Sequence, residues 1–265
     1  SVALTGSTAD LAAALAGTFA AAYTGNVTIT DANATSIAAT DISTINTSTT
    51  GTITVTNNIN ITGTAAEVAA AVGNVDTFAG SPTATLSNAH TLAELKAINN
   101  ATSGTITLND YSVALTGSTA DLAAALAGTF AAAYTGNITT TDSHTVAQLK
   151  AINNATSGTI TLNDYTVALA GSSSDLAAAL AGSFSSSYTG TVTITNADYT
   201  VAQLKAINNA TTGSITLSTT NTNLTGTAGD LVSAFAGTIT THTGDITITD
   251  TPTSAQLSLI HICRC

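Results

Sequence analysis

The stretch SVALTGSTADLAAALAGTFAAAYTGN occupies residues 112–137 and recurs without a change at residues 1–26. A second stretch, KAINNATSGTITLNDY, occupies residues 150–165 and recurs without a change at residues 96–111. Weaker copies fill the rest of the chain to residue 256. Self-similarity at a fixed period is the signature of a repeat architecture, with a unit of about 54 residues here. We divide residues 1–256 into approximate copies at 1–58, 59–111, 112–165 and 166–220, with a partial copy at 221–256.

Each copy holds two expected short helices, and each helix opens on a capping signal. The long half of the unit carries Ser-x-x-Asp at residues 118–121, and the short half carries Thr-x-x-Gln at residues 145–148. The hydroxyl caps a free backbone N–H, and the acidic or amide side chain reaches back or meets the helix dipole. Gly128 and the pair Asn153-Asn154 are expected to end these helices, because both residue types tolerate the left-handed conformation.

A strand is expected after each helix, with the alternating pattern Gly-x-[Val/Ile]-Thr-[Ile/Leu/Val]. A strand, a crossover helix and a further strand at this spacing predict parallel pairing and a right-handed crossover. The first inward-facing positions are spaced alternately by about 22 and about 32 residues, and they are Val27, Ile53, Ala84, Ile106, Ile138, Ile160, Val192, Ile215 and Ile246.

These patterns predict an α/β fold, namely a repeat solenoid of alternating coils of about 22 and about 32 residues, measured between the first inward positions of successive strands. One continuous parallel β-sheet is expected on one side and the short helices on the opposite side. Phe19, Phe78, Phe130 and Phe184 are expected to form a further internal row. The segment from Leu108 to Leu115 either turns a corner or closes a hairpin at Asn109-Asp110.

The chain is acidic, with a formal charge of −11 and only four Lys and Arg residues. A basic footprint for nucleic acid is therefore absent. The longest apolar run, Leu122 to Tyr134, is too short to insert in a membrane as a helix. No signal peptide and no initial Met are present. Both observations suit an internal fragment, and they are compatible with secretion of the parent protein.

The last nine residues, 257–265, read LSLIHICRC and depart from the repeat. The pattern at Gln148-Leu149 predicts Lys-Ala-Ile-Asn-Asn after Leu257. Instead, the peptide LSLIHI is the translation of one reading frame of a common transposase sequencing adapter. We interpret this tail as read-through in a metagenomic open reading frame. Both cysteines lie in it, so the repeat region is expected to contain neither disulfides nor thiol chemistry.

One threonine is expected to face outward in every strand. At the spacing of neighbouring strands, about 4.8 Å, these residues would form a continuous threonine row. The row is expected to be a solvated face whose threonines stabilise the sheet, and the alternative is a regular binding face for ice, glycan or mineral. Its members are Thr28, Thr54, Thr85, Thr107, Thr139, Thr161, Thr193, Thr216 and Thr247.

Acidic and histidine side chains give no catalytic or metal site in the sequence. Single aspartates follow strands and are expected to cap turns, with calcium between stacked coils as the alternative; they are Asp31, Asp110, Asp142, Asp164 and Asp250. His90 and His144 precede helix caps, whereas Tyr199 stands near the same place in another copy. His242 replaces the Tyr of the Tyr134-Thr-Gly sequence. Because near-identical repeats duplicate every feature, a single catalytic centre and an enzymatic function are not expected.

At residues 151–162, AINNATSGTITL, and residues 113–122, VALTGSTADL, the chain resembles repeats of very long bacterial surface and adhesin-like proteins, notably of cyanobacteria. The resemblance covers residues 1–256. It implies an exported protein with a cell-surface or extracellular-matrix role. The resulting hypothesis is a structural spacer or stalk segment of a large adhesin-like protein, whose partners are adjacent repeats of the same longer chain. The alternative is a binding module that uses the threonine row to contact ice, an extracellular glycan or a mineral surface.

Overall fold

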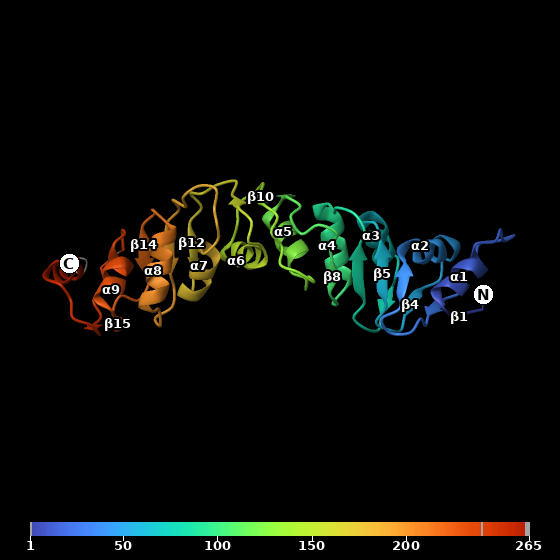
Figure 1. Ribbon diagram of the computed structural model, residues 1–265, viewed down its shortest axis with the longest axis horizontal. Coiled ribbons are helices and arrows are strands. Elements are labelled where there is room, and N and C mark those ends of the chain that lie inside the picture. The colour runs from blue at the N-terminus through green and yellow to red at the C-terminus, as the bar shows by residue number, and fades with distance from the viewer. Residues whose placement is uncertain (1, 240, 263–265) are drawn as a thin grey trace. The chain divides into compact units, whose positions relative to one another are not determined.

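A computed structural model describes residues 2–239 and 241–262, without the side chains of residues 261 and 262. The chain divides into two compact units. The first comprises Ser1–Leu115 and Ala124–Gly136, and the second comprises Thr116–Ala123 and Asn137–Cys265. Each unit is built from short helices that alternate with short strands, as the labels in Figure 1 show.

Ten helices lie in the described part of the chain, and all are two to three turns long. Consecutive helices pack together, α1 to α4 in the first unit and α6 to α10 in the second. Their bounds are α1 Thr8–Leu15, α2 Ala39–Ser48, α3 Ala65–Gly73, α4 Leu92–Ala101, α5 Thr119–Leu126, α6 Val146–Ala155, α7 Ser173–Leu180, α8 Val201–Ala210, α9 Ala228–Phe235 and α10 Ser254–Ile262.

The predicted start signals are confirmed as capping interactions. At α6, the Thr145 hydroxyl accepts a bond from the Gln148 N–H (3.3 Å), and the Gln148 carbonyl oxygen accepts one from the Thr145 N–H (2.9 Å). The same reciprocal box opens α3, α4 and α8. At α7 the Ser172 hydroxyl accepts a bond from the Asp175 N–H (3.1 Å) and donates to the Asp175 carboxylate (2.8 Å). Local sequence therefore decides where the helices begin.

Every strand pairing is parallel, as predicted, but the sheets are several and small. The first unit contains the orders β1-β2-β4-β6 and β3-β5-β7-β8; the second contains β9-β10-β11, β12-β13-β14 and β15-β16. The prediction of one continuous sheet is wrong. The strands are β1 Leu4–Gly6, β2 Val27–Ile29, β3 Ser36–Ala38, β4 Ile53–Val55, β5 Asn60–Gly63, β6 Thr77–Phe78, β7 Thr83–Leu86, β8 Ile106–Thr107, β9 Leu115–Gly117, β10 Ile138–Thr140, β11 Ile160–Thr161, β12 Leu169–Gly171, β13 Val192–Ile194, β14 Ile215–Leu217, β15 Leu224–Gly226 and β16 Ile246–Ile248.

The sheets break because the strands and the helices follow different periods. In the second unit, the starts of successive helices are almost evenly spaced, at Val146, Ser173, Val201 and Ala228. Paired strand residues are closer together in sequence, as Ile138 is to Ile160. The number of residues between a paired strand and the helix that follows it therefore grows with each pairing step in this unit. A new sheet begins before every second helix, with β9 before α5, β12 before α7 and β15 before α9.

The predicted steps of about 22 and about 32 residues hold for the inward strand positions: the shorter step joins paired strands, as from Ile138 to Ile160, and the longer step leads into another sheet, as from Ile160 to Val192. Below, a coil is one helix with the chain that leads to the next helix.

The predicted inward positions are confirmed in eight of nine strands. Val27, Ile53, Ala84, Ile106, Ile138, Ile160, Val192 and Ile215 are all buried, whereas Ile246 in β16 is half-buried. The phenylalanine row is wrong. Phe19 is 48% exposed and Phe78, Phe130 and Phe184 are half-buried. Phe19, Phe130 and Phe184 lie on the connections that follow α1, α5 and α7, and Phe78 lies in the two-residue strand β6 at the edge of its sheet.

The long-half helix α5 ends at Leu126, just before Gly128 as expected, but the left-handed helix ends that were expected are not found in the part of the chain that the structure describes. Asn153 and Asn154 lie inside α6, which ends at Ala155 with Thr156 in an extended conformation. Ala181, before Gly182, is right-handed at the end of α7. Among the described residues no glycine has a positive φ. The glycine after a long-half helix is therefore needed for another reason, namely the space that a neighbouring asparagine occupies.

The segment between β8 and β9 turns a corner rather than closing a hairpin. β8 and β9 belong to different sheets, so they do not pair with each other. Within the corner, the Leu108 N–H donates to the Tyr111 hydroxyl (3.1 Å), and the Ser112 N–H donates to Asp110 (2.7 Å). This local turn carries the chain from one sheet to the next.

Candidate functional site

The predicted threonine row faces outward but is divided into separate ladders. Thr28 pairs with Thr54, Thr85 with Thr107, Thr139 with Thr161, and Thr193 with Thr216. Thr247 pairs with Thr225 instead. Seven of the nine are half-buried, and Thr216 and Thr247 are exposed. The row is interrupted between Thr54 and Thr85, because these two residues lie in different sheets.

Other threonines complete the ladders in the first unit. Thr5 and Thr77 extend the Thr28–Thr54 pair at its two ends, and Thr62 pairs with Thr85. The sequence analysis missed these members because each lies outside the single strand position that the repeat pattern selected. The largest continuous hydroxyl array is consequently that of Thr5, Thr28, Thr54 and Thr77.

Polar residues that follow strands cap helices of the preceding coil. Asp142, after β10, accepts bonds from the N–H and the hydroxyl of Thr119 at the start of α5 (2.7 and 2.9 Å). Asn196 accepts the Ser173 N–H of α7 (2.7 Å) in the same way. The first four N–H groups of a helix lack partners within it, so these bonds satisfy donors that only the neighbouring coil reaches.

The other predicted aspartates fall into two groups. Asp31 and Asp250 cap α1 and α9 as Asp142 caps α5. Asp110 and Asp164 instead accept bonds from the N–H and hydroxyl two residues ahead, in Ser112 and Thr166. These hydrogen bonds lower the pKa of Asp110 and Asp164 below the ordinary value. All five carboxylates therefore take part in backbone capping.

Asparagines near the ends of the short-half helices cap the following helix. Asn153 of α6 donates from Nδ2 to the Ala178 carbonyl near the end of α7 (2.6 Å). Asn208 of α8 bonds to the Ser233 carbonyl of α9 likewise (2.9 Å). A Cβ added at Gly182 would overlap the Asn153 Oδ1. Glycine is thus required there by the close approach of the asparagine.

Replacing Asn153 with alanine is expected to lower the unfolding free energy by about 1–2 kcal/mol. The change removes a part-buried hydrogen bond and leaves a helix-terminal carbonyl without its partner. Asn154→Ala is the matched control, because Asn154 is exposed and its replacement should alter stability by less than about 0.5 kcal/mol. Urea unfolding followed by circular dichroism measures both, and equal effects would contradict the inter-helix role of Asn153.

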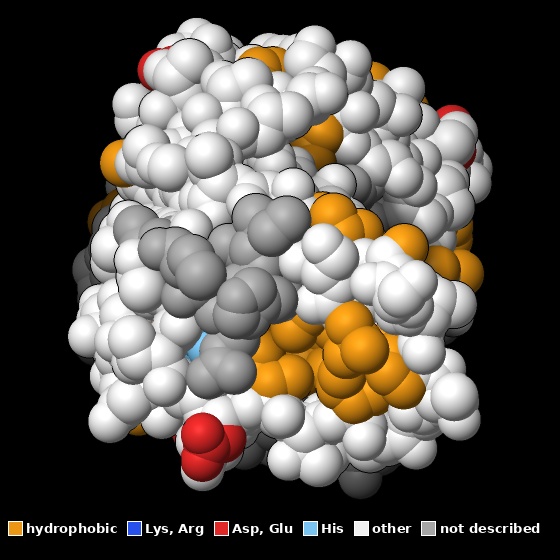
Figure 2. Space-filling model, turned by 90° about the vertical axis from the view of Figure 1, so that its left-hand side faces the viewer, with side chains coloured by type: hydrophobic (Ala, Val, Ile, Leu, Met, Phe, Trp, Pro, Cys, Tyr) orange, Lys and Arg blue, Asp and Glu red, His pale blue; other side chains and the backbone are white. Residues whose placement is uncertain are grey.

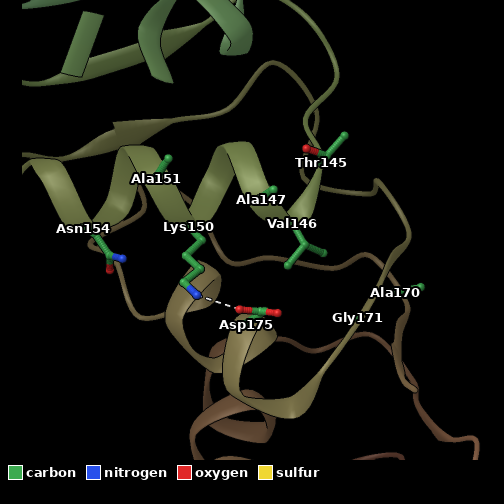
Figure 3. A pocket seen from close by; sticks show the side chains of 9 residues that line it. All are labelled: Thr145, Val146, Ala147, Lys150, Ala151, Asn154, Ala170, Gly171 and Asp175. Atoms are coloured by element: carbon green, nitrogen blue, oxygen red, sulfur yellow. Dashed lines mark hydrogen bonds and ion pairs between the residues drawn. The ribbon is translucent and has the colours of Figure 1, made fainter. Parts of the chain in front are cut away.

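A groove of about 560 Å³ runs along α6 and β12 in the second unit. Figure 3 shows Lys150 of α6 reaching Asp175 of α7 across it, with an Nζ–Oδ1 distance of 2.6 Å. Val146, Ala147 and other small side chains form its remaining walls. A related groove of about 470 Å³ contains Lys205 and Asp230, 2.7 Å apart. The groove therefore recurs with the repeat.

The ion pair in each groove is a surface interaction. The side chains of Lys150 and Asp175 are 40% and 45% exposed. Lys150 and the Ser172 hydroxyl lower the pKa of Asp175. Exposed pairs of this kind contribute about 0–1 kcal/mol, because solvent screens them. The pair joins α6 to α7, and it pairs the two charged side chains of the groove, Lys150 and Asp175, with each other.

Histidine and tyrosine side chains form buried pairs two coils apart in sequence. His90 Nε2 lies 3.2 Å from the Tyr134 hydroxyl, which also donates to the Val113 carbonyl (2.6 Å). His144 Nε2 lies 3.1 Å from the Tyr188 hydroxyl, which donates to the Val167 carbonyl (2.5 Å). Burial raises the pKa of both tyrosines, so their hydroxyls are protonated and act as donors.

In the next copy the two residue types are exchanged. Tyr199 stands in the position of His144, and His242 stands in that of Tyr188, with ring centroids 6.3 Å apart. His242 Nε2 bonds to the Thr222 carbonyl (2.9 Å), the counterpart of the Val167 carbonyl. An exchange that keeps the aromatic contact and the carbonyl bond indicates packing between coils as the role of these residues.

The outer surface carries few charges. Figure 2 shows one face on which hydrophobic patches are surrounded by backbone and by side chains that are neither charged nor hydrophobic, with a few acidic side chains. Over the described residues, no three or more His, Cys, Asp or Glu side chains are grouped so that they could hold a metal ion. No helix in this part of the chain combines the length and apolar character needed to cross a membrane.

No protein-family model matches the chain, and no curated protein matches it in sequence. The structure brings together aspartate or asparagine with a helix start, asparagine with a helix end, and histidine with tyrosine. The sequence analysis missed the asparagine caps, whose signal was their constant separation of 25 residues from the carbonyls that they bind.

Proposed function

We propose that the chain is a non-catalytic structural spacer or stalk segment of a large secreted or cell-surface adhesin-like protein, built as a repeat solenoid. The observation that supports this most is how the recurring polar side chains are used. Aspartate, asparagine, histidine and tyrosine at repeated positions bond to backbone groups or side chains of another coil. A repeat whose polar groups serve stacking gains stability from its neighbours.

The resemblance to bacterial surface repeats supports the extracellular location, and the acidic, Thr-rich composition agrees with it. Adjacent repeats of the same longer chain are the partners of this proposal. The proposal includes no enzymatic activity. It also includes no cofactor, because the aspartates that were candidates for binding calcium accept hydrogen bonds from backbone N–H groups. Nucleic acid is not among the proposed partners, because the chain has a formal charge of −11 and phosphate binding requires a basic surface.

Deleting residues 112–165 tests the proposal directly. The deletion joins Tyr111 to Thr166, which reproduces the natural junction of Tyr165 with Thr166. We expect a folded protein with unchanged helix content per residue, whose maximum dimension in small-angle X-ray scattering decreases by the length of one repeat unit. Duplicating the same segment should increase this dimension by an equal step. Loss of folding, or an unchanged dimension in both variants, would contradict a modular spacer.

The alternative function is a binding module for ice, glycan or a mineral surface. The ladder of Thr5, Thr28, Thr54 and Thr77 is the observation that favours it. The division of the remaining threonines among several sheets favours the spacer, because a flat crystalline surface requires a long regular array.

The double variant Thr28→Lys/Thr54→Lys separates the two functions. Both threonines lie in the middle of the ladder that favours binding and face outward, so their replacement should leave the core intact. For a spacer we expect neither protein to inhibit ice recrystallisation or to bind a glycan array. Activity of the wild type that the double variant lacks would instead establish the binding module.

A further inference from the structure

The hydroxyl of Tyr188 connects three successive coils. Tyr188 lies between α7 and β13, its hydroxyl donates to the carbonyl of Val167 between β11 and β12, and His144 precedes α6. Tyr134 joins Val113 and His90 in the same way. His90 and His144 are each only 4% exposed, and the two tyrosines are 1% exposed. We call each set of histidine, tyrosine and carbonyl a clasp.

The hydrogen bonds of the clasp determine which nitrogen of the histidine carries the proton. A tyrosine hydroxyl has one hydrogen, and in Tyr188 it points to the Val167 carbonyl. The bond between His144 and Tyr188 therefore requires Nε2–H as donor and the hydroxyl oxygen as acceptor. Nδ1 of His144 is consequently the unprotonated nitrogen. The same argument holds for His90.

Nδ1 of His90 and of His144 is buried and has no hydrogen-bond partner among the described residues. A neutral imidazole tolerates this, because an unprotonated nitrogen that accepts no bond loses only modest solvation. A proton on Nδ1 would instead create a buried N–H donor without an acceptor and a positive charge remote from water. Both penalties apply to the folded state alone.

The negatively charged groups near the clasps favour protonation of the histidines, but their influence on the pKa is smaller than that of burial. Asp110, in the corner after β8, and Glu94, in the first turn of α4, act on His90. Asp164 and Asp142, which follow β11 and β10, act on His144. Their negative charge favours the protonated form. Burial is the larger influence, and it lowers the pKa of both histidines below the ordinary value.

We propose that the two clasps are an acid-sensitive device, in which protonation of His90 and His144 releases the contacts between successive coils. The unfolded chain takes up these protons near pH 6.5 and the folded chain only at lower pH. The contribution of the neutral histidines to the free energy of unfolding is therefore fully present above about pH 6.5, and it is lost as the pH falls through the interval between the pKa values of the unfolded and the folded chain. Each unit of pKa difference changes the opening equilibrium tenfold.

Hydrogen–deuterium exchange of the whole chain at about pH 7.5 and about pH 5, corrected for intrinsic exchange rates, tests the device. We expect peptides that contain His144 and Tyr188 to open more at the lower pH. Peptides from residues 53–79 provide the internal control, since they contain no histidine. An equal acid response in both regions would overturn the proposal.

The variant His144→Phe assigns the response to one side chain. Phenylalanine keeps the ring contact and leaves the bond from Tyr188 to Val167 intact, but it does not titrate. We expect the acid response to disappear around Tyr188 and to persist around His90 and Tyr134. An acid response around Tyr188 that is unchanged in the variant would refute the role of His144.

A measurement on the unaltered protein keeps the proposal testable if the variant does not fold. Nuclear magnetic resonance titration of the imidazole signals should show two histidines that protonate at lower pH than a histidine in a short model peptide. Titration of both His90 and His144 at the ordinary value would overturn the proposal.

Discussion

Replacing Leu204 with alanine is expected to lower the unfolding free energy by about 2–5 kcal/mol. Leu204 lies in α8 and has no exposed surface, and α8 packs against both α7 and α9. Truncation removes its hydrophobic contacts and leaves a cavity that short helices held from both sides cannot close. Chemical unfolding followed by circular dichroism measures the loss.

Leu257→Ala is the matched control for this prediction. Leu257 is the counterpart of Leu204 in α10, where the same Thr-x-x-Gln signal opens the helix, but it is 47% exposed. Its replacement should lower stability by less than about 1 kcal/mol, because much of the side chain already contacts water. A similar loss in the two variants would show that packing between helices is not what makes Leu204 important.

Gly190→Ala is expected to destabilise the protein by about 1–3 kcal/mol or more, as overpacking of a closed site does. A Cβ at Gly190 would overlap the backbone carbonyl of Val167 and press on the Tyr188 ring. The Gly190 N–H also donates to the Tyr165 carbonyl (2.9 Å), so the backbone cannot withdraw without losing a hydrogen bond. Thermal unfolding should show a lower Tm.

Gly229→Ala should change stability in the opposite direction. Gly229 lies in α9, and an added Cβ there meets nothing within 4 Å. Alanine in a helix is favoured over glycine by about 0.5–1 kcal/mol, so a higher Tm is expected. If Gly190→Ala were as stable as the wild type, the close approach of neighbouring coils at this glycine would be wrong.

Much of the local structure could be predicted from the sequence. The capping pairs at residues 118–121 and 145–148 placed helix starts correctly, because the hydroxyl of each pair accepts the backbone N–H three residues on, within the same turn. The alternation around Ile138 and Ile160 also predicted buried strands in parallel pairs. Both signals act over a few residues.

Helix ends could not be predicted in the same way. Gly182 follows a helix, where left-handed glycines are common, but it serves to accommodate Asn153 from the preceding helix. The two residues belong to different coils, so local propensity contains no trace of the contact. The sequence does not distinguish a glycine that is needed because a neighbouring residue leaves no room for a Cβ from one that is needed for a left-handed backbone.

The candidate sites were predicted only as separate parts. The outward position of the threonines was correct, since it follows from strand alternation. Their continuity was not, because it depends on which strands pair. His144 and Tyr134 were identified as separate repeat positions, whereas the 3.1 Å contact of His144 with Tyr188, the next copy of Tyr134, arises between coils that are two apart.

The sequence by itself determined the repeat, the short helices with their starts, and the parallel pairing of strands, because capping, alternation and connection length are local constraints. Only the tertiary structure decided how the strands divide into sheets. Along the second unit, the step from one helix to the next is longer than the step between paired strand residues. Strand pairing and helix packing have to be satisfied together, and the compromise between the two periods breaks the threonine row and joins each histidine to its tyrosine.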